Sequence, residues 1–124
     1  MQDHWNDDQP IYRQLRDKVI NLVLEGVFKE GEAVPSVRQI AAEYSINHLT
    51  VSKAYQELVD DGLLFKKRGV GMFVVEGARS QLLTNEKEKF LNDELPILLG
   101  RVKQLGFSTQ EIIDIIVTQD KDAG

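Results

Sequence analysis

Three short segments in the first half of the chain carry side chains that could hydrogen-bond to a polyanion. The first holds Arg38 and the third holds Arg68-Gly69. The second is the run Asn47-His48-Leu49-Thr50-Val51-Ser52-Lys53. Guanidinium, amide, hydroxyl and ammonium groups contact the phosphate oxygens and the base edges of duplex DNA. These residue types therefore predict contact with DNA, provided that the fold brings the segments to one side.

The first element that must position these segments is an amphipathic helix from about Pro10 to Gly26. Proline is favoured in the first turn of a helix, where its missing N–H would have no partner. Apolar residues recur at three- and four-residue steps, a helical period; they are Ile11, Leu15, Val19, Leu22 and Val23. Glycine often follows the last residue of a helix, so Gly26 is expected to end this one.

Two shorter helices joined by a tight turn are expected next. Ser36 and Gln39 have the spacing of a capping box, which begins the first of these helices. The turn is Ser45-Ile46, and Asn47 is a favoured N-cap for the second helix. The residues of that helix expected to face the core are Val51, Ala54, Tyr55 and Leu58. The residues left facing outward are His48, Leu49, Ser52, Lys53 and Gln56.

A β-hairpin is expected after these helices. Two β-prone runs, Leu63-Leu64-Phe65 and Met72-Phe73-Val74-Val75, flank the turn residues Arg68-Gly69-Val70-Gly71. Helices followed by a hairpin with a basic tip are typical of a winged helix-turn-helix. In this fold the second helix of the helix-turn-helix enters the DNA major groove. We therefore predict a mostly helical α+β chain with this domain at residues 1–78.

A two-helix tail is expected at residues 79–124. One long amphipathic helix runs from about Ser80, and Pro96 should kink or split it. Gly106-Phe107 breaks it, and a second capping box at Ser108 begins the final helix. So small a tail cannot bury its apolar residues alone, so it must pack on the first domain or on a second copy of the chain, and the second copy is favoured. The predicted dimerisation residues are Leu91, Leu95, Leu98, Leu99, Val102, Ile112 and Ile116.

The composition is that of a globular protein with an acidic surface. The net charge of −5 opposes a DNA partner at first sight. The acids Asp3, Asp7 and Asp8 and those of the tail lie outside the predicted motif, however, so a DNA-binding face on an acidic body is expected. The basic residues within the motif are Arg38, Lys53, Lys66, Lys67 and Arg68. The absence of cysteine fits the cytoplasm, and no signal peptide or membrane-spanning run is visible. His4 and His48 are the two histidines, with no carboxylate cluster spaced for a metal site. No cofactor is expected.

The chain resembles the GntR family of bacterial transcription regulators. The matching residues begin with Pro10-Ile11-Tyr12-Arg13-Gln14-Leu15, Gly31 and Val34-Pro35-Ser36-Val37-Arg38-Gln39-Ile40-Ala41. They continue with Asn47, Thr50-Val51-Ser52-Lys53-Ala54-Tyr55, Leu58, Gly62-Leu63 and Gly69-Val70-Gly71-Met72-Phe73-Val74. The short tail further resembles the YtrA-like subfamily. This resemblance implies a homodimer, formed through the C-terminal helices, that binds an inverted-repeat operator, often as a repressor of transporter operons.

The residues expected at the DNA are Arg38, Asn47, His48, Leu49, Thr50, Ser52, Lys53, Arg68 and Gly69. Several have structural alternatives. Arg38 could pair with Glu43 or Asp17, and Lys53 with Glu57. Thr50 could serve only as a capping partner of Asn47. His48 could be a pH-sensitive contact or a solvated side chain. The three tyrosines are expected in the core, while Trp5 has no assigned function.

Other function classes are less well supported by the sequence. No nucleophile–base arrangement, P-loop or catalytic carboxylate pair is visible, so an enzyme is not expected. A winged helix that binds proteins without DNA is the main alternative, since folds of this kind serve several functions. The basic hairpin tip and the polar start of the second motif helix argue against it. A small-molecule effector is expected at the interface between tail and wing domain, or not at all.

Overall fold

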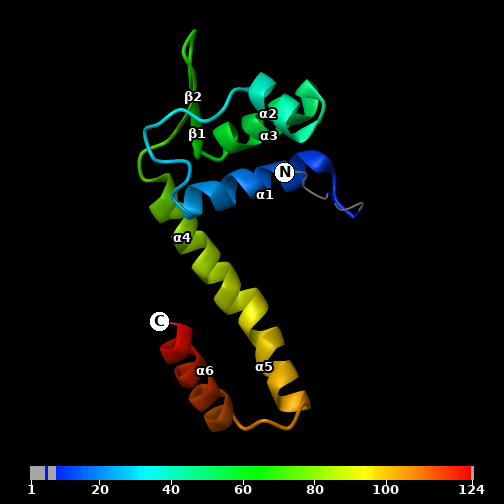
Figure 1. Cartoon of the computed structure of the whole chain (residues 1–124), viewed down its shortest axis with the longest axis vertical. Coiled ribbons are helices and arrows are strands. Elements are labelled where there is room, and N and C mark those ends of the chain that lie inside the picture. The colour runs from blue at the N-terminus through cyan, green and yellow to red at the C-terminus, as the bar shows by residue number, and fades with distance from the viewer. Residues whose placement is uncertain (1–4, 6–7, 124) are drawn as a thin grey trace. The chain divides into compact units, whose positions relative to one another are not determined.

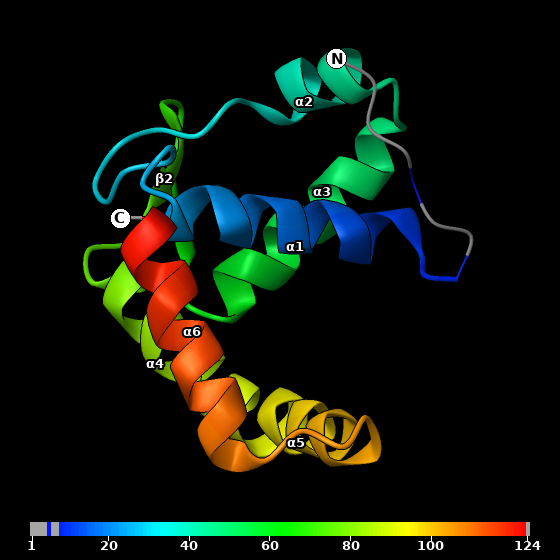
Figure 2. The same ribbon diagram turned by 60° about the horizontal axis from the view of Figure 1, so that its bottom comes forward.

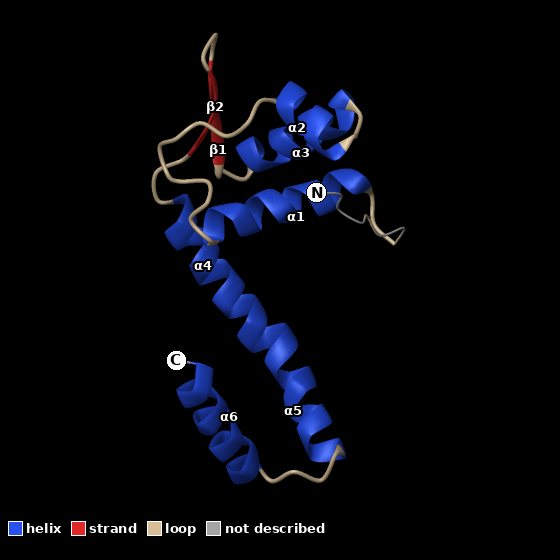
Figure 3. Cartoon of the chain, viewed as in Figure 1, coloured by secondary structure: helices blue, strands red, loops and turns tan. Residues whose placement is uncertain are grey.

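The computed structural model describes residue 5 and residues 8–123 of the chain (Figure 1). The chain divides into two compact units, Met1–Leu83 and Thr84–Gly124, called here the N-terminal unit and the tail unit. Helices dominate both units, and the described strands form a single two-stranded sheet (Figure 3). The predicted mostly helical α+β class is confirmed.

Helix α1 (Ile11–Leu24) begins directly after Pro10, as predicted. It buries Leu15, Val19 and Val23 in the core of the N-terminal unit. Gly26 follows the end of the helix with a φ of 79°, in the left-handed region that favours glycine. The predicted stop signal is therefore confirmed, and so is the stripe except at Ile11, which is exposed.

Helices α2 (Val37–Tyr44) and α3 (His48–Asp60) form the helix-turn-helix. The capping box at α2 is complete, since the Gln39 N–H donates to Ser36 Oγ at 3.1 Å and the Ser36 N–H donates to Gln39 Oε1 at 2.8 Å. Ser45 makes the turn in the left-handed region, with a φ of 55°. Asn47 caps α3 by accepting the Leu49 N–H on Oδ1 at 2.7 Å. Local hydrogen bonds thus fix the start of both helices.

The inner face of α3 packs against α1, which lies beside it in Figure 1 and crosses it in the view of Figure 2. The residues predicted to face the core are all buried; they are Val51, Ala54, Tyr55 and Leu58. Tyr55 also donates its hydroxyl to the Pro35 carbonyl at 2.6 Å, which ties α3 to the segment before α2. Burial raises the pKa of Tyr55 above its ordinary value, so this hydroxyl remains a donor.

Removing the Tyr55 hydroxyl is expected to destabilise the protein. Tyr55→Phe keeps the buried ring but leaves the Pro35 carbonyl without its donor, so the free energy of unfolding should fall by about 1 kcal/mol. Urea denaturation with an unchanged m-value would measure the loss. Tyr12→Phe is the control, because the Tyr12 hydroxyl makes only an exposed contact of 3.5 Å with Arg13. Equal losses in the two variants would contradict the role given to Tyr55.

The wing is an antiparallel hairpin of β1 (Leu64–Lys67) and β2 (Gly71–Val74). Its register pairs Leu64 with Val74 at the base and Lys67 with Gly71 at the tip. The predicted hairpin is confirmed, although Leu63 lies before the first strand and the ladder runs on to Lys67. Leu63 is buried in the core, and its carbonyl accepts from the Val75 N–H at 3.0 Å. The sheet therefore projects the residues between the strands, Arg68 to Val70.

The beginning of α4 (Ala78–Lys89) belongs to the N-terminal unit. Ala78 and Leu82 are buried in its core. Arg79 holds the loop after α1, because its backbone N–H donates to Glu30 Oε2 at 2.9 Å and its Nε donates to the Leu24 carbonyl at 2.8 Å. The N-terminal unit thus extends to Leu83, beyond residue 78, where the sequence led us to expect its end.

The rest of the chain forms the tail unit. After α4 the helix passes through a π-helical turn, η1 (Phe90–Glu94), into α5 (Leu95–Gln104). Pro96 has no N–H to bond to the carbonyl four residues earlier. The π turn just before it gives the Leu95 N–H the Phe90 carbonyl as acceptor, so the helix continues instead of splitting at Pro96.

Helix α6 (Thr109–Ala123) follows a break at Gly106, whose φ is 86°. The second predicted capping box is present, with the Glu111 N–H donating to Ser108 Oγ at 3.1 Å and the Ser108 N–H donating to Glu111 Oε1 at 2.9 Å. The bond from the Ser108 N–H, and after it a bond from the Ser108 side chain, lower the pKa of the Glu111 carboxyl. The predicted break at Gly106-Phe107 and the predicted capping box at Ser108 are therefore confirmed.

Candidate nucleic-acid interface

The N-terminal unit presents the predicted DNA-contact residues from three elements. Arg38 comes from the first turn of α2, and the run from Asn47 to Lys53 covers the start of α3. Arg68 and Gly69 come from the wing tip. Of these residues all are exposed except Thr50, which is half-buried, and Val51, which belongs to the core. In Figure 1, α2, α3 and the wing lie on the same side of α1.

Arg38 is an exposed cation held by a rigid backbone. It stands two residues after the N-cap Ser36, within the turn that the capping box fixes. Neither Glu43 nor Asp17 pairs with it among the residues that the structure describes. Its guanidinium fork therefore remains free for a phosphate or a guanine edge.

Asn47 forms the side-chain capping bond at the start of α3. Its side chain accepts from the Leu49 N–H, so Thr50 is not the partner of this capping bond. The Thr50 N–H donates to the Asn47 main-chain carbonyl at 3.0 Å instead. His48, Leu49 and Ser52 are exposed in the first turns. This is the part of a recognition helix that reaches base edges.

Lys53 lies in a contact that the sequence did not indicate. Its Nζ is 3.9 Å from the centre of the Tyr12 ring, a cation–π geometry. The alternative pair with Glu57 is not the arrangement found, because Glu57 faces Arg16. Tyr12 also accepts from Arg13 Nε at 3.5 Å, and this bond is the main cause of the lowered Tyr12 pKa. Tyr12 therefore positions a cation of α3 from the start of α1.

The acidic side chains at the end of α3 have hydrogen-bond or ion-pair partners within the N-terminal unit. Arg16 Nε lies 3.8 Å from Glu57 Oε1, and the Arg16 guanidinium also pairs with Asp61. Gln56 Nε2 donates to Asp60 Oδ1 at 2.9 Å. Glu57 and Asp60 stand in the second half of α3 and Asp61 directly follows it, while the run from Asn47 to Tyr55 contains no acid. The net charge of −5 is thus not concentrated where α3 begins.

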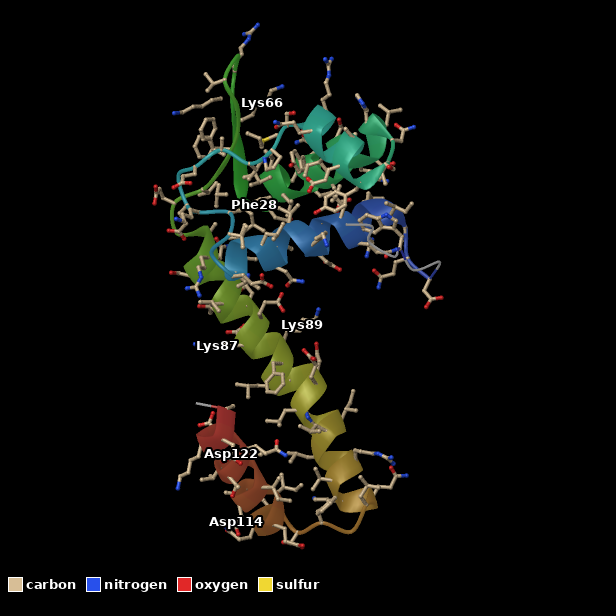
Figure 4. All side chains as sticks on the ribbon, in the orientation of Figure 1. Phe28, Lys66, Lys87, Lys89, Asp114 and Asp122 are labelled. Carbon is tan, nitrogen blue, oxygen red and sulfur yellow. The ribbon has the colours of Figure 1, made fainter. Side chains whose placement is uncertain are left out.

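The wing tip is a tight turn with an exposed arginine. The Val70 N–H donates to the Lys67 carbonyl at 2.9 Å, and Gly69 has a φ of 77°, which favours glycine. Lys67 Nζ lies 5.0 Å from the Phe73 ring centre, whereas Lys66 projects from the wing (Figure 4). Arg68 is therefore the cation nearest the end of the hairpin.

Loss of the wing-tip cation is expected to change the salt dependence of DNA binding. Arg68→Ala should weaken binding and reduce the slope of log K against log salt by about one unit per subunit, because one phosphate contact is lost. Binding titrations at several salt concentrations would measure this slope. Arg101→Ala removes the same charge from α5 of the tail and should leave the slope unchanged. A slope equal to that of the parent chain would remove Arg68 from the interface.

The comparisons with known proteins agree with this geometry. The model of the family "Bacterial regulatory proteins, gntR family" matches residues 11–74, which include every described element of the candidate interface. The chain belongs to the GntR family. YtrA, an HTH-type transcriptional repressor of Bacillus subtilis, is 37% identical over 103 residues, 83% of this chain and 78% of YtrA. A match of this length includes part of the tail, so the predicted resemblance to YtrA-like members is confirmed.

Solved structures extend the comparison to most of this GntR chain. A GntR-family transcriptional regulator from Bacteroides thetaiotaomicron is 30% identical with a TM-score of 0.74, and the match covers 93% of this chain and 100% of that one. The DNA-binding domain of AraR, solved in complex with operator ORX1, has a TM-score of 0.56 over 60% of this chain and 95% of its own. At 22% identity the AraR likeness concerns the fold alone.

Membership of the GntR family makes the chain a DNA-binding transcription regulator and not an enzyme. In the part of this GntR chain that the structure describes, no helix is long and apolar enough to cross a membrane. No cluster of three potential metal ligands occurs among the same residues. His4, the second histidine of the sequence, lies outside the described residues.

The GntR tail unit keeps much of its apolar surface exposed. Of the predicted dimerisation residues, those exposed are Leu91, Leu98, Leu99 and Ile116. Leu95 and Ile112 are half-buried, whereas Val102 is buried in the described chain itself. Further apolar residues of the tail are exposed but were not among the predicted dimerisation residues; they are Phe90, Ile97, Leu105, Phe107, Ile113, Ile115 and Val117. The dense aliphatic run of α6 was the signal that could have added Ile113, Ile115 and Val117.

Proposed function

We propose that this chain is a repressor that binds an inverted-repeat operator as a homodimer. The observation that carries the proposal is the exposed set of Arg38, the start of α3 and the wing tip on one compact unit. In this proposal α3 enters the major groove, where Asn47, His48, Leu49, Thr50 and Ser52 meet base edges and phosphates. Arg38 and Lys53 contact the DNA beside these residues. Arg68-Gly69 enters the minor groove, because the negative potential of a narrow minor groove attracts arginine.

The tail unit supports the homodimer. Monomeric proteins rarely expose large contiguous apolar patches, and α5 and α6 carry many exposed aliphatic side chains. A two-fold pairing of tails would cover the same surface on both copies. Two copies would then present two recognition helices to two half-sites, which explains why the operator is proposed to be an inverted repeat.

Repression and location follow from the relatives rather than from the geometry. YtrA is a repressor by name, and AraR was solved on an operator. A repressor acts where it occupies the operator, so we place this chain in the cytoplasm with its DNA. A winged helix that binds protein partners only is the competing function, favoured by the net charge of −5. Its interface would tolerate apolar or acidic residues along the start of α3, where polar ones prevail.

Fluorescence anisotropy with the chain's own upstream intergenic DNA tests the proposal. Tight and salt-sensitive binding to this duplex, but not to a scrambled duplex of equal composition, is expected from a sequence-specific regulator. Footprinting of the bound fragment would then show whether two half-sites are protected. Equal weak binding to both duplexes would contradict the proposal and favour the protein-binding alternative.

A further inference from the structure

Leu49 is unusual among the residues at the start of α3. Its side chain is 77% exposed, and no large apolar side chain of the described residues is more so. Its neighbours on the outward face, His48, Ser52 and Lys53, are polar. A protein-docking surface gathers several apolar side chains into one patch. Leu49 is the apolar residue among these outward-facing polar residues of α3, so its position fits a partner that offers one small apolar group within polar surroundings.

The backbone presents Leu49 in a fixed position. Its own N–H is bound by Asn47 Oδ1 at 2.7 Å, which sets the first turn of α3. Two residues later Val51 is fully buried, and Tyr55 anchors the helix to the Pro35 carbonyl. The side chain of Leu49 therefore points outward from a helix that cannot easily rotate or shift. A contact made by this side chain would be selective, because the helix could not adjust to a different partner.

The major groove of DNA offers one apolar group that matches such a side chain. Each base edge there shows hydrogen-bond donors or acceptors, and only thymine adds a C5-methyl group. Leucine can neither donate nor accept, so the polar edge of guanine, adenine or cytosine would lose water without gaining a partner. On the basis of the proposed placement of α3 in the major groove, we infer that Leu49 reads thymine by packing on its C5-methyl group in each half-site.

Replacement of thymine by uracil tests this assignment, because it removes the methyl group and keeps every base pair. The probe is the footprinted duplex with one symmetric pair of thymines replaced by uracil at a time. Loss of a buried methyl group corresponds to about fourfold in Kd, so one pair of positions should weaken binding of the dimer about fifteenfold. Anisotropy titration at constant salt would measure each duplex.

Variants of Leu49 identify the side chain responsible. Leu49→Ala keeps a good helix former at the site, and it should bind the thymine and uracil duplexes equally at that pair of positions. Leu49→Met retains a long apolar side chain and should keep most of the discrimination. Arg38→Ala is the control, since it should bind less tightly but remain sensitive to uracil at the same positions.

The outcomes separate this inference from the proposed function. Failure to bind the unmodified duplex more tightly than the scrambled one would contradict the DNA-binding proposal itself. Normal operator binding with no uracil-sensitive pair would overturn the thymine assignment alone. A uracil-sensitive pair that remains equally sensitive in Leu49→Ala would also overturn it, because another side chain would then contact the methyl group.

Discussion

Leu98→Asp is expected to dissociate the homodimer and to weaken operator binding roughly 100-fold or more, the scale on which a second linked binding event contributes. Leu98 is about half exposed on α5, within the apolar surface proposed to pair with a second copy. A carboxylate there would lose its water on dimerisation without gaining a partner. Sedimentation velocity would follow the mass of the protein, and anisotropy would follow its affinity for the operator duplex.

A charge-matched control separates this effect from general repulsion of DNA. Asn85→Asp adds the same negative charge in a wholly polar stretch of α4, from Thr84 to Lys89. This variant should remain a dimer and keep nearly full affinity. If Leu98→Asp stayed dimeric at the same concentration, the interface would lie elsewhere on the chain. Far-ultraviolet circular dichroism of both variants would show that the helices are retained.

Arg38→Ala is expected to weaken operator binding by about 1–3 kcal/mol per half-site, or roughly 5- to 150-fold in Kd. The loss follows from the bidentate contact that a free guanidinium makes with the O6 and N7 atoms of guanine. Because Arg38 has no acidic partner in the described part of the chain, its removal should leave the stability of the fold unchanged. Binding titration and urea denaturation would measure the two effects separately.

Arg38→Lys distinguishes base reading from charge neutralisation. Lysine keeps the charge but lacks the planar fork, so a guanine-reading arginine cannot be replaced by it. The lysine variant should therefore lose most of the affinity that the alanine variant loses. If lysine restored parental affinity, Arg38 would be a phosphate contact and would carry no sequence information.

Local signals predicted the frame of the N-terminal unit well. Both capping boxes and the Asn47 cap join residues two or three positions apart, so their geometry follows from spacing alone. The buried face of α3 follows from its helical period for the same reason. The hairpin was also predictable, although its strands shift by up to two residues from the predicted bounds.

Contacts between distant segments were not predictable from these signals. Tyr55 reaches Pro35 across 20 residues, and Arg16 reaches Asp61 across 45. Lys53 on Tyr12 is a contact of the same kind, and it replaces the local pair with Glu57 that spacing suggested. Such partners depend on how α1 crosses α3, which no periodicity specifies. The exposure of Leu49 likewise became informative only once its polar neighbours could be placed around it.

The pairing of Arg16 with Glu57 and Asp61 has a consequence for how the regulator searches a genome. The pairing neutralises acids at the end of α3, the start of α3 contains none, and the chain has no surplus of lysine and arginine, so few counterions should be released at random sequence. The regulator should stay only briefly on unrelated DNA. Only a small fraction of its molecules should therefore be bound to the many competing sites. A modest number of copies per cell can then keep an operator occupied.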